Sequence, residues 1–479
     1  MTKKIIVWFK RDFRFIDNPA LYYAAQDGVV IPVYIHFPTS IKGKLTNSEI
    51  FHDQALLSFQ KTINQSGGRL LIREEDPATI LPKLIQEAGA NALYFNLSYE
   101  PEQVQLDQYI YDNTLVPVQR FHAGLLTEPG TILNKQGKPY KVFTSFWKSL
   151  SSFPIQKPLP QPKEITWEQS EVNEKEPIFE NTTISSHWKA GGEKEALNKL
   201  QLFLENQLED YKTYRDYPGM DATSRLSPHL AQGEISPRLI WHETQEQLEL
   251  TGMEKELSHT YEESAEAFLK QLVWRDFAYH QLAVFPHIVN QPPLQPSYRN
   301  FPWIAKEQEI FAKWKDGLTG YPIVDAGMRE LNETGYMHNR VRMITASFLV
   351  KHLLIHWGEG QAWFEKQLVD HDLANNTMGW QWVAGTGFDA SPFFRIFNPI
   401  KQAEKFDPPD GIYIRKWVPE LKTLPTKYIY HPAEAPKDIL NQASVTIGQD
   451  YPAPIVEHRF ARERALEAFQ NMKREGKDT

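Results

Sequence analysis

The chain has 479 residues, of which 41% are hydrophobic and 23% charged, a composition typical of a globular protein with about two to four domains. A formal net charge of −8 excludes a global basic field, so binding to nucleic acid would need a local basic patch. The chain has no cysteine, which excludes disulfides, thiolate zinc sites, cysteine-ligated iron–sulfur clusters and a thiol nucleophile, and fits a reducing cytoplasm.

Residues 1–122 alternate short β-branched or aromatic runs with helical segments. The expected strands are Ile5–Phe9, Val29–His36, Arg69–Ile72, Ala92–Asn96 and Pro117–Phe121. The expected helices between them are Asn18–Gln26, Ile50–Gln65, Asp76–Ala88 and Glu102–Asn113. This order predicts a doubly wound, Rossmann-like α/β domain with a parallel sheet. The two common glycine-rich phosphate motifs are missing from it.

Residues 123–190 are rich in Pro, Ser, Lys and Glu, and we expect an interdomain linker on the surface. Residues 191–479 form the larger predicted domain, which is all-α and ends in a helix over Pro454–Lys473. The most apolar helix, near 343–357, carries Lys351, His352 and His356, so no membrane span is predicted.

Three stretches of the helical part carry polar groups that could perform chemistry. In the first, Ser227 and Pro228 resemble a capping hydroxyl and the first residue of a helix, with Thr223 and Ser224 just upstream. Hydroxyls and free amides at a helix N-terminus suit a phosphate. Simple capping is the alternative, and the local sequence favours it.

The second stretch is a predicted helix over Tyr261–Leu282. Trp274 beside Arg275 offers a stacking face and a phosphate contact, whereas a buried helix with a snorkelling arginine is the alternative.

The third stretch, residues 321–400, is a dense apolar run that contains charges. We expect one helix over Met337–Trp357, with Arg340 and Arg342 near the positive end of its dipole. Cations there indicate anionic partners, and Asp370 and Asp372 are the nearest candidates in sequence. A structural ion pair is the alternative to a ligand site.

These motifs together resemble the DNA photolyase and cryptochrome flavoproteins over nearly the whole chain. The resemblance rests on the following segments: VWFKRDFRFIDNPAL at Val7–Leu21, TSRLSPHL, QLVWRDF, WKDGLTGYPIVDAGMREL, MHNRVRMITASFLVKHLL, NNTMGWQW, FRIFNP, and YPAPIVEHRFARERAL at Tyr451–Leu466. The most similar branch is that of bacterial class I photolyases, which repair cyclobutane pyrimidine dimers in DNA. The resemblance implies a cytoplasmic, monomeric enzyme without a metal.

The resemblance implies that the helical domain binds FAD. The positions matching its cofactor contacts are Tyr211, Thr223, Ser224, Arg225, Leu226, Ser227, Phe268, Arg275, Arg342, Asp370, His371, Asp372 and Asn376. Arg342 matches a guanidinium paired with Asp370, and Asn376 matches the residue beside flavin N5. A buried anionic flavin requires fixed donors and a paired cation, in agreement with these residue types.

The resemblance also implies a route for electrons and a pocket for the lesion. Trp380, Trp357 and Trp303 match the photoreduction chain, and Gln271 and Asn376 complete the expected catalytic set. The positions matching lesion or DNA contacts are Arg215, Gln271, Trp274, Asn339, Arg340, Met343, Trp382, Arg395 and Gln402. UV-damaged DNA is therefore the expected partner, with the damaged base flipped out of the duplex.

One position departs from the pattern of cyclobutane-dimer photolyases, because they carry glutamate where this chain has Gln271. (6–4) photolyases carry glutamine there, but they have two histidines where this chain has Asn339 and Met343. Two of the three positions thus favour a cyclobutane dimer, with a (6–4) photolyase as an alternative. A second alternative is a cryptochrome photoreceptor, disfavoured by Asn376 and by a chain that ends soon after its terminal helix. An antenna chromophore (a folate, a deazaflavin or a flavin) is also possible.

Overall fold

The computed structural model describes residues 3–36, 45–169, 188, 191–254, 259–290 and 292–475. It divides into two compact units. The first comprises residues 1–212 and 224–286, and the second comprises residues 213–223 and 287–479. The sheet therefore shares a unit with several helices that follow it in the sequence. The division into 1–122, 123–190 and 191–479 stays a prediction based on composition.

The first unit contains the expected parallel sheet. Its strands are β1 (Lys4–Phe9), β2 (Val29–His36), β3 (Leu71–Glu74), β4 (Ala92–Asn96) and β5 (Val118–Phe121), in the order β3-β2-β1-β4-β5. All four strand pairings are parallel, with Ile5 opposite Val30 on one side of β1 and Ala92 on the other. The Rossmann-like prediction is confirmed, and each strand boundary lies within about two residues of its expected position.

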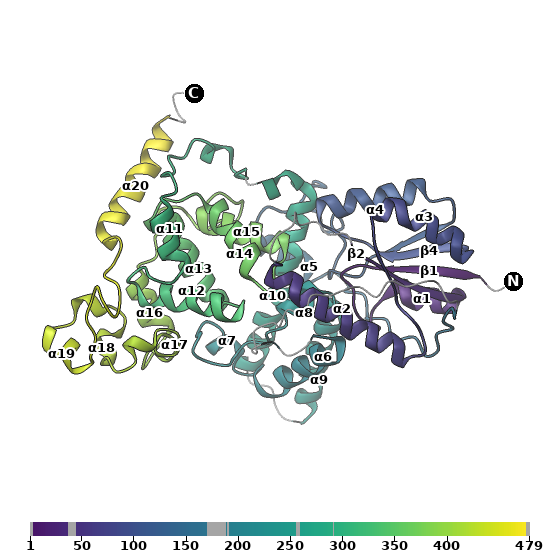
Figure 1. Cartoon of the computed structure of the whole chain (residues 1–479), viewed down its shortest axis with the longest axis horizontal. Coiled ribbons are helices and arrows are strands. Elements are labelled where there is room, and N and C mark those ends of the chain that lie inside the picture. Colours follow the sequence, from purple (N-terminus) through teal and green to yellow (C-terminus); the bar gives the residue numbers. More distant parts are fainter. Residues whose placement is uncertain are drawn as a thin grey trace. The chain divides into compact units, whose positions relative to one another are not determined.

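Helices cover both faces of the sheet (Figure 1). They are α1 (Pro19–Asp27), α2 (Asn47–Gln65), α3 (Pro77–Ala88) and α4 (Pro101–Asn113). Alternation along β1 explains this arrangement, because successive side chains point to opposite faces. Ile5 and Val7 pack in a core with α1 and α2, whereas Ile6 and Trp8 pack in another with α3 and α4.

Residues 123–169 do not lie wholly on the surface as expected. They include α5 (Phe143–Leu150), and Leu125, Phe146 and Leu150 are almost completely buried. Apolar residues at helical spacing within α5 explain the burial, because one face of the helix then packs inward. Residues 170–187, 189 and 190 of the predicted linker lie outside the described residues.

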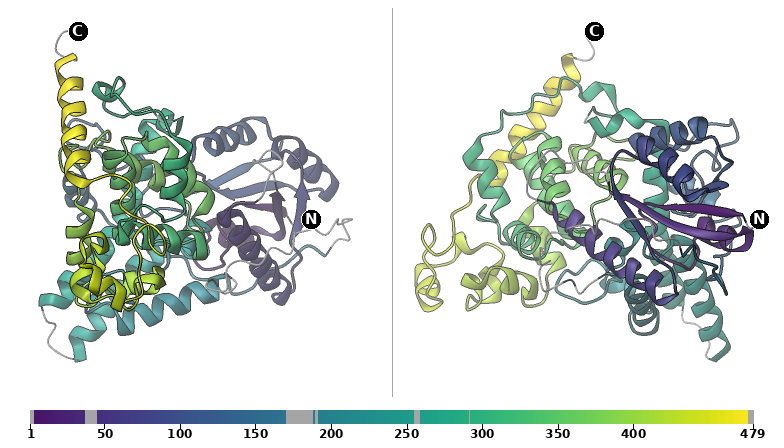
Figure 2. Two further views of the ribbon diagram at one scale, coloured as in Figure 1. Left: turned by 60° about the vertical axis from the view of Figure 1, so that its left-hand side comes forward. Right: turned by 45° about the vertical axis from the view of Figure 1, so that its right-hand side comes forward.

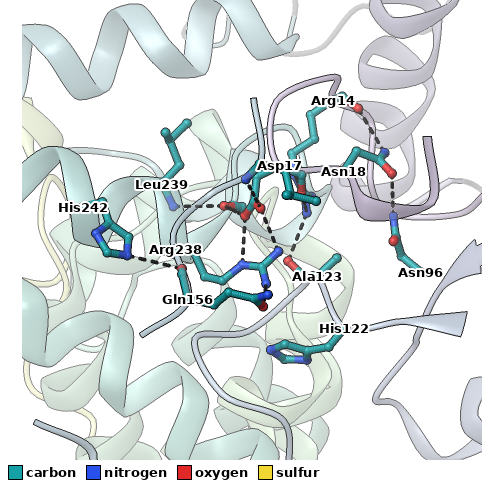
Figure 3. A network of polar contacts seen from close by, with 12 residues as sticks. Arg14, Asp17, Asn18, Asn96, His122, Ala123, Gln156, Arg238, Leu239 and His242 are labelled. Atoms are coloured by element: carbon teal, nitrogen blue, oxygen red, sulfur yellow. Dashed lines mark hydrogen bonds and ion pairs between the residues drawn. The ribbon is translucent and has the colours of Figure 1, made fainter. Parts of the chain in front are cut away.

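A buried polar network joins the loop after β1 to later segments of the same unit (Figure 3). Asp17 accepts hydrogen bonds from Arg238 Nη2 at 2.7 Å, Arg238 Nε at 3.0 Å and Ser236 Oγ at 2.5 Å. Arg14 donates to the carbonyl oxygens of Gly233 and Ala123. Asp17 and Arg238 are almost inaccessible to solvent, so each charge depends on the other to remain buried.

The remaining helices of this unit carry part of the predicted site. They are α6 (Glu193–Asn206), α7 (Tyr211–Tyr214, which extends into the second unit), α8 (Ser227–Ala231), α9 (Pro237–Glu254) and α10 (His259–Val284).

The second unit is helical. Its elements are η1 (Pro286–Asn290), η2 (Pro296–Tyr298), α11 (Gln308–Lys315), α12 (Pro322–Thr334), α13 (Asn339–Ser347), η3 (Phe348–His352), α14 (Trp357–Gln367), α15 (Leu373–Ala384), α16 (Pro399–Phe406), α17 (Ile412–Trp417), η4 (Pro419–Leu421), α18 (Thr426–Ile429), η5 (Pro432–Glu434), α19 (Lys437–Gln442) and α20 (His458–Glu475). Its main core contains the fully buried Trp314 and Trp357. The predicted α/β plus all-α fold class is confirmed.

The expected single helix over Met337–Trp357 is wrong. The helix α13 passes into η3, which is one turn of π-helix, and Leu354 then takes a left-handed backbone with φ of 54°. A leucine in that region is strained, so packing must hold it there. The next helix, α14, begins at Trp357 with His356 as its N-cap.

The C-terminal helix α20, yellow in Figure 2, packs against η3 of its own unit. The rings of His352 and His458 stack there, with a hydrogen bond of 2.8 Å between Nε2 and Nδ1. Among the described residues, no helix has the length and apolar character needed to cross a membrane.

Candidate functional site

In the second unit, Arg342 of α13 forms an ion pair with Asp370. Arg342 Nη2 lies 2.8 and 3.0 Å from the two Asp370 carboxylate oxygens, and Arg342 Nε donates to the Met337 carbonyl oxygen. Burial alone would lower the pKa of Arg342, but the Asp370 carboxylate raises it above its ordinary value. This charged pair lies beside an apolar core, as the sequence predicts.

Helix α15 presents an accessible polar face next to this pair. Asp372 is its N-cap and accepts hydrogen bonds from Asn375 N at 2.9 Å and Asn375 Nδ2 at 2.8 Å. Asn376 Nδ2 donates to the Gln361 carbonyl oxygen at 3.1 Å. Gly379 is exposed, and a Cβ placed on it would have no atom within 4 Å. The face combines fixed donors and acceptors with open space, which suits the polar edge of a flat ring.

Arg340 has an anionic partner, as predicted, but the partner is neither Asp370 nor Asp372. Its Nη2 lies 2.7 Å from Asp216 Oδ2, and its guanidinium lies 4.4 Å from the centre of the Phe406 ring. Asp216 is also 3.9 Å from Arg215 Nε. Two predicted DNA contacts, Arg215 and Arg340, therefore flank one carboxylate.

Other predicted DNA contacts of this unit are accessible. Asn339 and Arg395 are exposed, and Met343, Trp382 and Gln402 are partly buried. His371, a predicted cofactor contact, is also partly buried.

A buried lysine fixes the backbone at Arg395. Lys351 Nζ donates to the Arg395 carbonyl oxygen at 2.9 Å. Burial, together with the charge of Arg395, lowers the pKa of Lys351 to about 7.

The three predicted electron-transfer tryptophans all lie in this unit, with Trp303 in a loop, Trp357 on α14 and Trp380 on α15. A Cβ placed on Gly360 of α14 would lie 2.1 Å from a ring carbon of Trp380 on α15, so the ring covers that glycine. Trp357 stands one turn before Gly360 on α14. Trp357 and Trp380 are buried, whereas Trp303 is partly accessible.

In the first unit, two predicted cofactor contacts belong to one aromatic cluster. The rings of Tyr211 and Phe268 are 5.5 Å apart, and Phe203 lies 5.6 and 4.5 Å from them, respectively. Ser264 of α10 anchors α7, because its hydroxyl donates to the Glu209 carbonyl oxygen and accepts from Lys212 N.

The segment Thr223–Ser227 differs from its predicted capping geometry. Leu226, not Ser227, is the N-cap of α8, and the Leu226 side chain makes no capping hydrogen bond. Ser227 is itself the first helical residue of α8, so it is not the N-cap. Pro228 then falls within the first turn, where proline is tolerated. Leu226 is buried, while Arg225 is exposed with a positive φ of 50°.

The helix α10 places Gln271, Trp274 and Arg275 on one partly accessible face, at spacings of three and four residues. The ring of Trp274 stacks on Phe143, with centroids 3.5 Å apart and planes at 4°. Arg275 Nη1 donates to the Gly124 carbonyl oxygen at 2.7 Å.

Asp276, the next residue of α10, is buried and accepts hydrogen bonds from the backbone N–H groups of Leu126 and Thr127. Burial raises the pKa of Asp276 to about 6 despite these hydrogen bonds. Residues 124–127 are therefore fixed to α10 by two adjacent side chains.

The structure gathers the predicted residues into two groups, one in each unit. Thr223 belongs to the second unit and Ser224–Ser227 to the first. The sequence-based prediction missed Asp216, Phe143 and Gly124 as partners of predicted residues. Asp216 stands next to Arg215, so an acid beside a predicted DNA contact was the signal available for it.

A Rossmann-like sheet in one unit, and a partly buried ion pair beside an accessible polar face in the other, are features expected of a two-part protein that binds a nucleotide or flavin. Comparison with known proteins narrows this class. Residues 5–163 match the family described as DNA photolyase, and residues 268–471 match the FAD binding domain of DNA photolyase.

Individual relatives agree with the family match. The chain is 44% identical to a deoxyribodipyrimidine photo-lyase of Agrobacterium fabrum, covering 99% of each chain. It is 35% identical to Cryptochrome-2 of Arabidopsis thaliana, over 98% of this chain and 79% of that protein. A bacterial class III photolyase from Agrobacterium tumefaciens shares the fold with a TM-score of 0.91 and 43% identity, covering 99% of this chain and 98% of the other. The chain belongs to the DNA photolyase and cryptochrome family.

Proposed function

We propose that the chain is a light-driven DNA repair enzyme that splits cyclobutane pyrimidine dimers and uses FAD as its cofactor. The observation that carries this proposal is the Arg342–Asp370 ion pair beside the accessible face of α15. The family supports the same conclusion, because the relatives at 44% and 36% identity are both named deoxyribodipyrimidine photo-lyase.

The residues present fit a flavin. In the second unit, Arg342 would supply a fixed positive charge, Asp372 an acceptor and Asn376 an amide beside the ring. Gly379 leaves room for a ring on α15, where a larger side chain would occupy the space. The remaining proposed contacts are Tyr211, Thr223, Ser224, Arg225, Leu226, Ser227, Phe268, Arg275, Asp370 and His371.

When bound, FAD would supply the electron that light transfers to the lesion, and the protein would hold the reacting groups in place. Trp274 and Trp382 would offer flat faces to a flipped base, and Gln271 could both donate and accept hydrogen bonds at its carbonyls. Trp274 has one face covered by Phe143, so its opposite face is the one proposed for stacking.

The remaining contacts would hold the DNA backbone or the lesion. Arg215, Arg340 and Arg395 carry the positive charge needed to bind phosphates, which gives affinity that falls with salt. Asn339, Met343 and Gln402 offer neutral contacts on accessible faces. This local patch would allow binding despite the net charge of −8.

Trp380, Trp357 and Trp303 would deliver electrons from the protein surface during photoreduction. Their order from buried to accessible supports that direction, because the outermost oxidised residue must be reduced by solutes.

Single positions support the choice of lesion. Asn339 and Met343 support a cyclobutane dimer, and Gln271 is the one feature that favours a (6–4) lesion. The motifs support class I, and the similarity to a class III photolyase over nearly the full chain favours class III as the alternative. A folate, deazaflavin or flavin antenna, a monomeric state, a cytoplasmic location and the lack of a metal stay predictions.

A repair assay with two substrates tests the proposal. The purified protein, with its flavin reduced by light, is given oligonucleotides that contain either one cyclobutane dimer or one (6–4) lesion. We expect illumination to restore only the cyclobutane substrate, with no repair in the dark. Repair of the (6–4) substrate alone would assign the other lesion. No turnover of either, with flavin bound, would favour a cryptochrome photoreceptor.

A further inference from the structure

The imidazole of His356 lies between two of the three tryptophans proposed for electron transfer. Its ring centre is 5.0 Å from that of Trp357, with the planes at 29°, and 5.3 Å from that of Trp303, with the planes at 79°. One aromatic ring thus contacts both the buried and the accessible tryptophan.

A helix cap fixes this imidazole. His356 is the N-cap of α14, and its Nδ1 accepts a hydrogen bond from Gly358 N at 3.0 Å. An accepting Nδ1 carries no proton, so the ring is neutral with its hydrogen on Nε2. Burial lowers the pKa of His356 and opposes protonation, while Glu359 acts in the other direction. Glu359 is itself paired with Lys306 at 2.6 Å.

Backbone hydrogen bonds hold Trp303 against the same imidazole. Ile304 N donates to the Leu354 carbonyl oxygen at 2.9 Å, which joins the tryptophan loop to the segment just before α14. The ring of Phe301 also contacts Trp303, with the ring centres 4.4 Å apart. Leu354, whose backbone is strained, therefore accepts the hydrogen bond that joins the Trp303 loop to the segment containing His356.

We propose that His356 is a positioning residue that provides the ring contact across which an electron passes from Trp303 to Trp357. This inference rests on the proposed function. Bound FAD would supply the light-driven electron acceptor. Within the chain, Trp380 would be the first donor, Trp357 would refill Trp380, and Trp303 would refill Trp357. The radical cation left on Trp303 then loses its indole N–H proton to water, and an external thiol reduces it. His356 is neither oxidised nor reduced.

The neutral state of His356 matters for this role. A charged imidazolium would repel the positive charge that resides transiently on Trp357. The capping hydrogen bond from Gly358 N excludes that state as long as it persists, so helix formation and electron transfer depend on the same nitrogen atom.

Two substitutions separate the role of the His356 ring in electron transfer from the role of its Nδ1 atom in capping α14. His356→Asn keeps an amide oxygen that can cap α14 but removes the ring, whereas His356→Phe keeps a ring but removes the capping acceptor. The FAD-bound protein is excited with a short laser pulse, and the yield of oxidised tryptophan is followed by transient absorption. Trp303→Phe identifies the part of the signal that belongs to the outer tryptophan. The Tm of each variant independently measures how much the helix cap contributes to stability.

We expect His356→Asn to lower the yield of oxidised Trp303 severalfold with little change in Tm. We expect His356→Phe to retain most of that yield and to unfold at a lower temperature. A wild-type yield in His356→Asn, with the signal abolished in Trp303→Phe, would overturn the inference. Repair by chemically reduced wild-type protein is measured separately, so failure of the proposed function is distinguishable from failure of this role.

Discussion

Position 271 is the residue at which this chain departs from the cyclobutane-dimer pattern. Gln271 Nε2 donates to the Ala267 carbonyl oxygen at 2.8 Å, which fixes the orientation of the amide on the accessible face of α10. We expect Gln271→Glu to preserve or raise cyclobutane repair, because a carboxyl group can accept the same hydrogen bonds and can also hold a proton. Repair rates under matched flavin reduction measure this. A clear loss of repair in the variant would contradict the role given to this position.

Asp216 neutralises a predicted DNA contact, and this has a measurable consequence. Replacing it by Asn removes the negative charge 2.7 Å from Arg340. We expect tighter DNA binding by Asp216→Asn, with a salt dependence steeper by about one phosphate contact. Fluorescence anisotropy over a series of salt concentrations tests this.

Glu420→Gln is the matched control for Asp216→Asn. It breaks the Arg329–Glu420 pair, which has the same separation of 2.7 Å and a similar exposure, at residues not proposed to touch DNA. An equal change in both variants, or an unchanged salt dependence in Asp216→Asn, would show that Asp216 has no specific effect on Arg340.

At the scale of elements, the buried network of Asp17 and Arg238 joins the β1 loop to the start of α9 (Figure 3). Removing one member leaves the other charge buried without its partner. We therefore expect Asp17→Ala to lower the free energy of unfolding by about 3–5 kcal/mol. Denaturant unfolding followed by circular dichroism measures it. Glu404→Ala, which breaks the exposed Lys401–Glu404 pair, should change stability by less than about 1 kcal/mol. Similar losses in the two variants would be inconsistent with this view.

The docking of α20 on η3 should depend on pH. Burial, and then the charges of His458, Arg464 and Lys351, lower the pKa of His352 to about 3, against about 6.5 in an unfolded chain. The unfolded chain therefore takes up the proton first as the pH falls below 6.5. The resulting stability is fully present above pH 6.5 and is lost towards pH 3, by up to about 5 kcal/mol.

Hydrogen exchange in α20 and the free energy of unfolding between pH 7 and 5 measure this dependence. We expect His352→Gln to be less stable than the wild type at pH 7 but to lose less stability on acidification. Parallel pH profiles for the two proteins would contradict the assignment to His352.

The segment Met337–Trp357, which contains η3, shows which features could not be predicted from the sequence. Apolar spacing over Met337–Trp357 continues through the helix breaks, because buried residues there still face one core. Hydrophobic periodicity predicts which residues are buried, but it does not predict a turn of π-helix or the left-handed backbone conformation of Leu354. The strands were predicted well because β-branched runs between helices determine both their positions and their parallel order.

At the scale of the whole molecule, the motifs predicted the family, but the contacts of the site residues came from distant segments. Arg340 pairs with Asp216 across 124 residues of sequence, and Arg275 bonds to Gly124 across 151. No local pattern encodes such partners. The composition of residues 123–190 likewise suggested a linker, although Phe146 and Leu150 turned out to be buried.

If the chain is a photolyase, bound FAD would supply the electron that splits a cyclobutane dimer under illumination and would regain it afterwards. Counting repaired dimers per reduced flavin tests this claim most directly. The flavin is reduced once, the reductant and oxygen are removed, and excess dimer-containing oligonucleotide is illuminated. We predict that many dimers are repaired for each flavin, with the flavin still reduced at the end. One dimer or fewer per flavin, with the flavin left oxidised, would contradict the account.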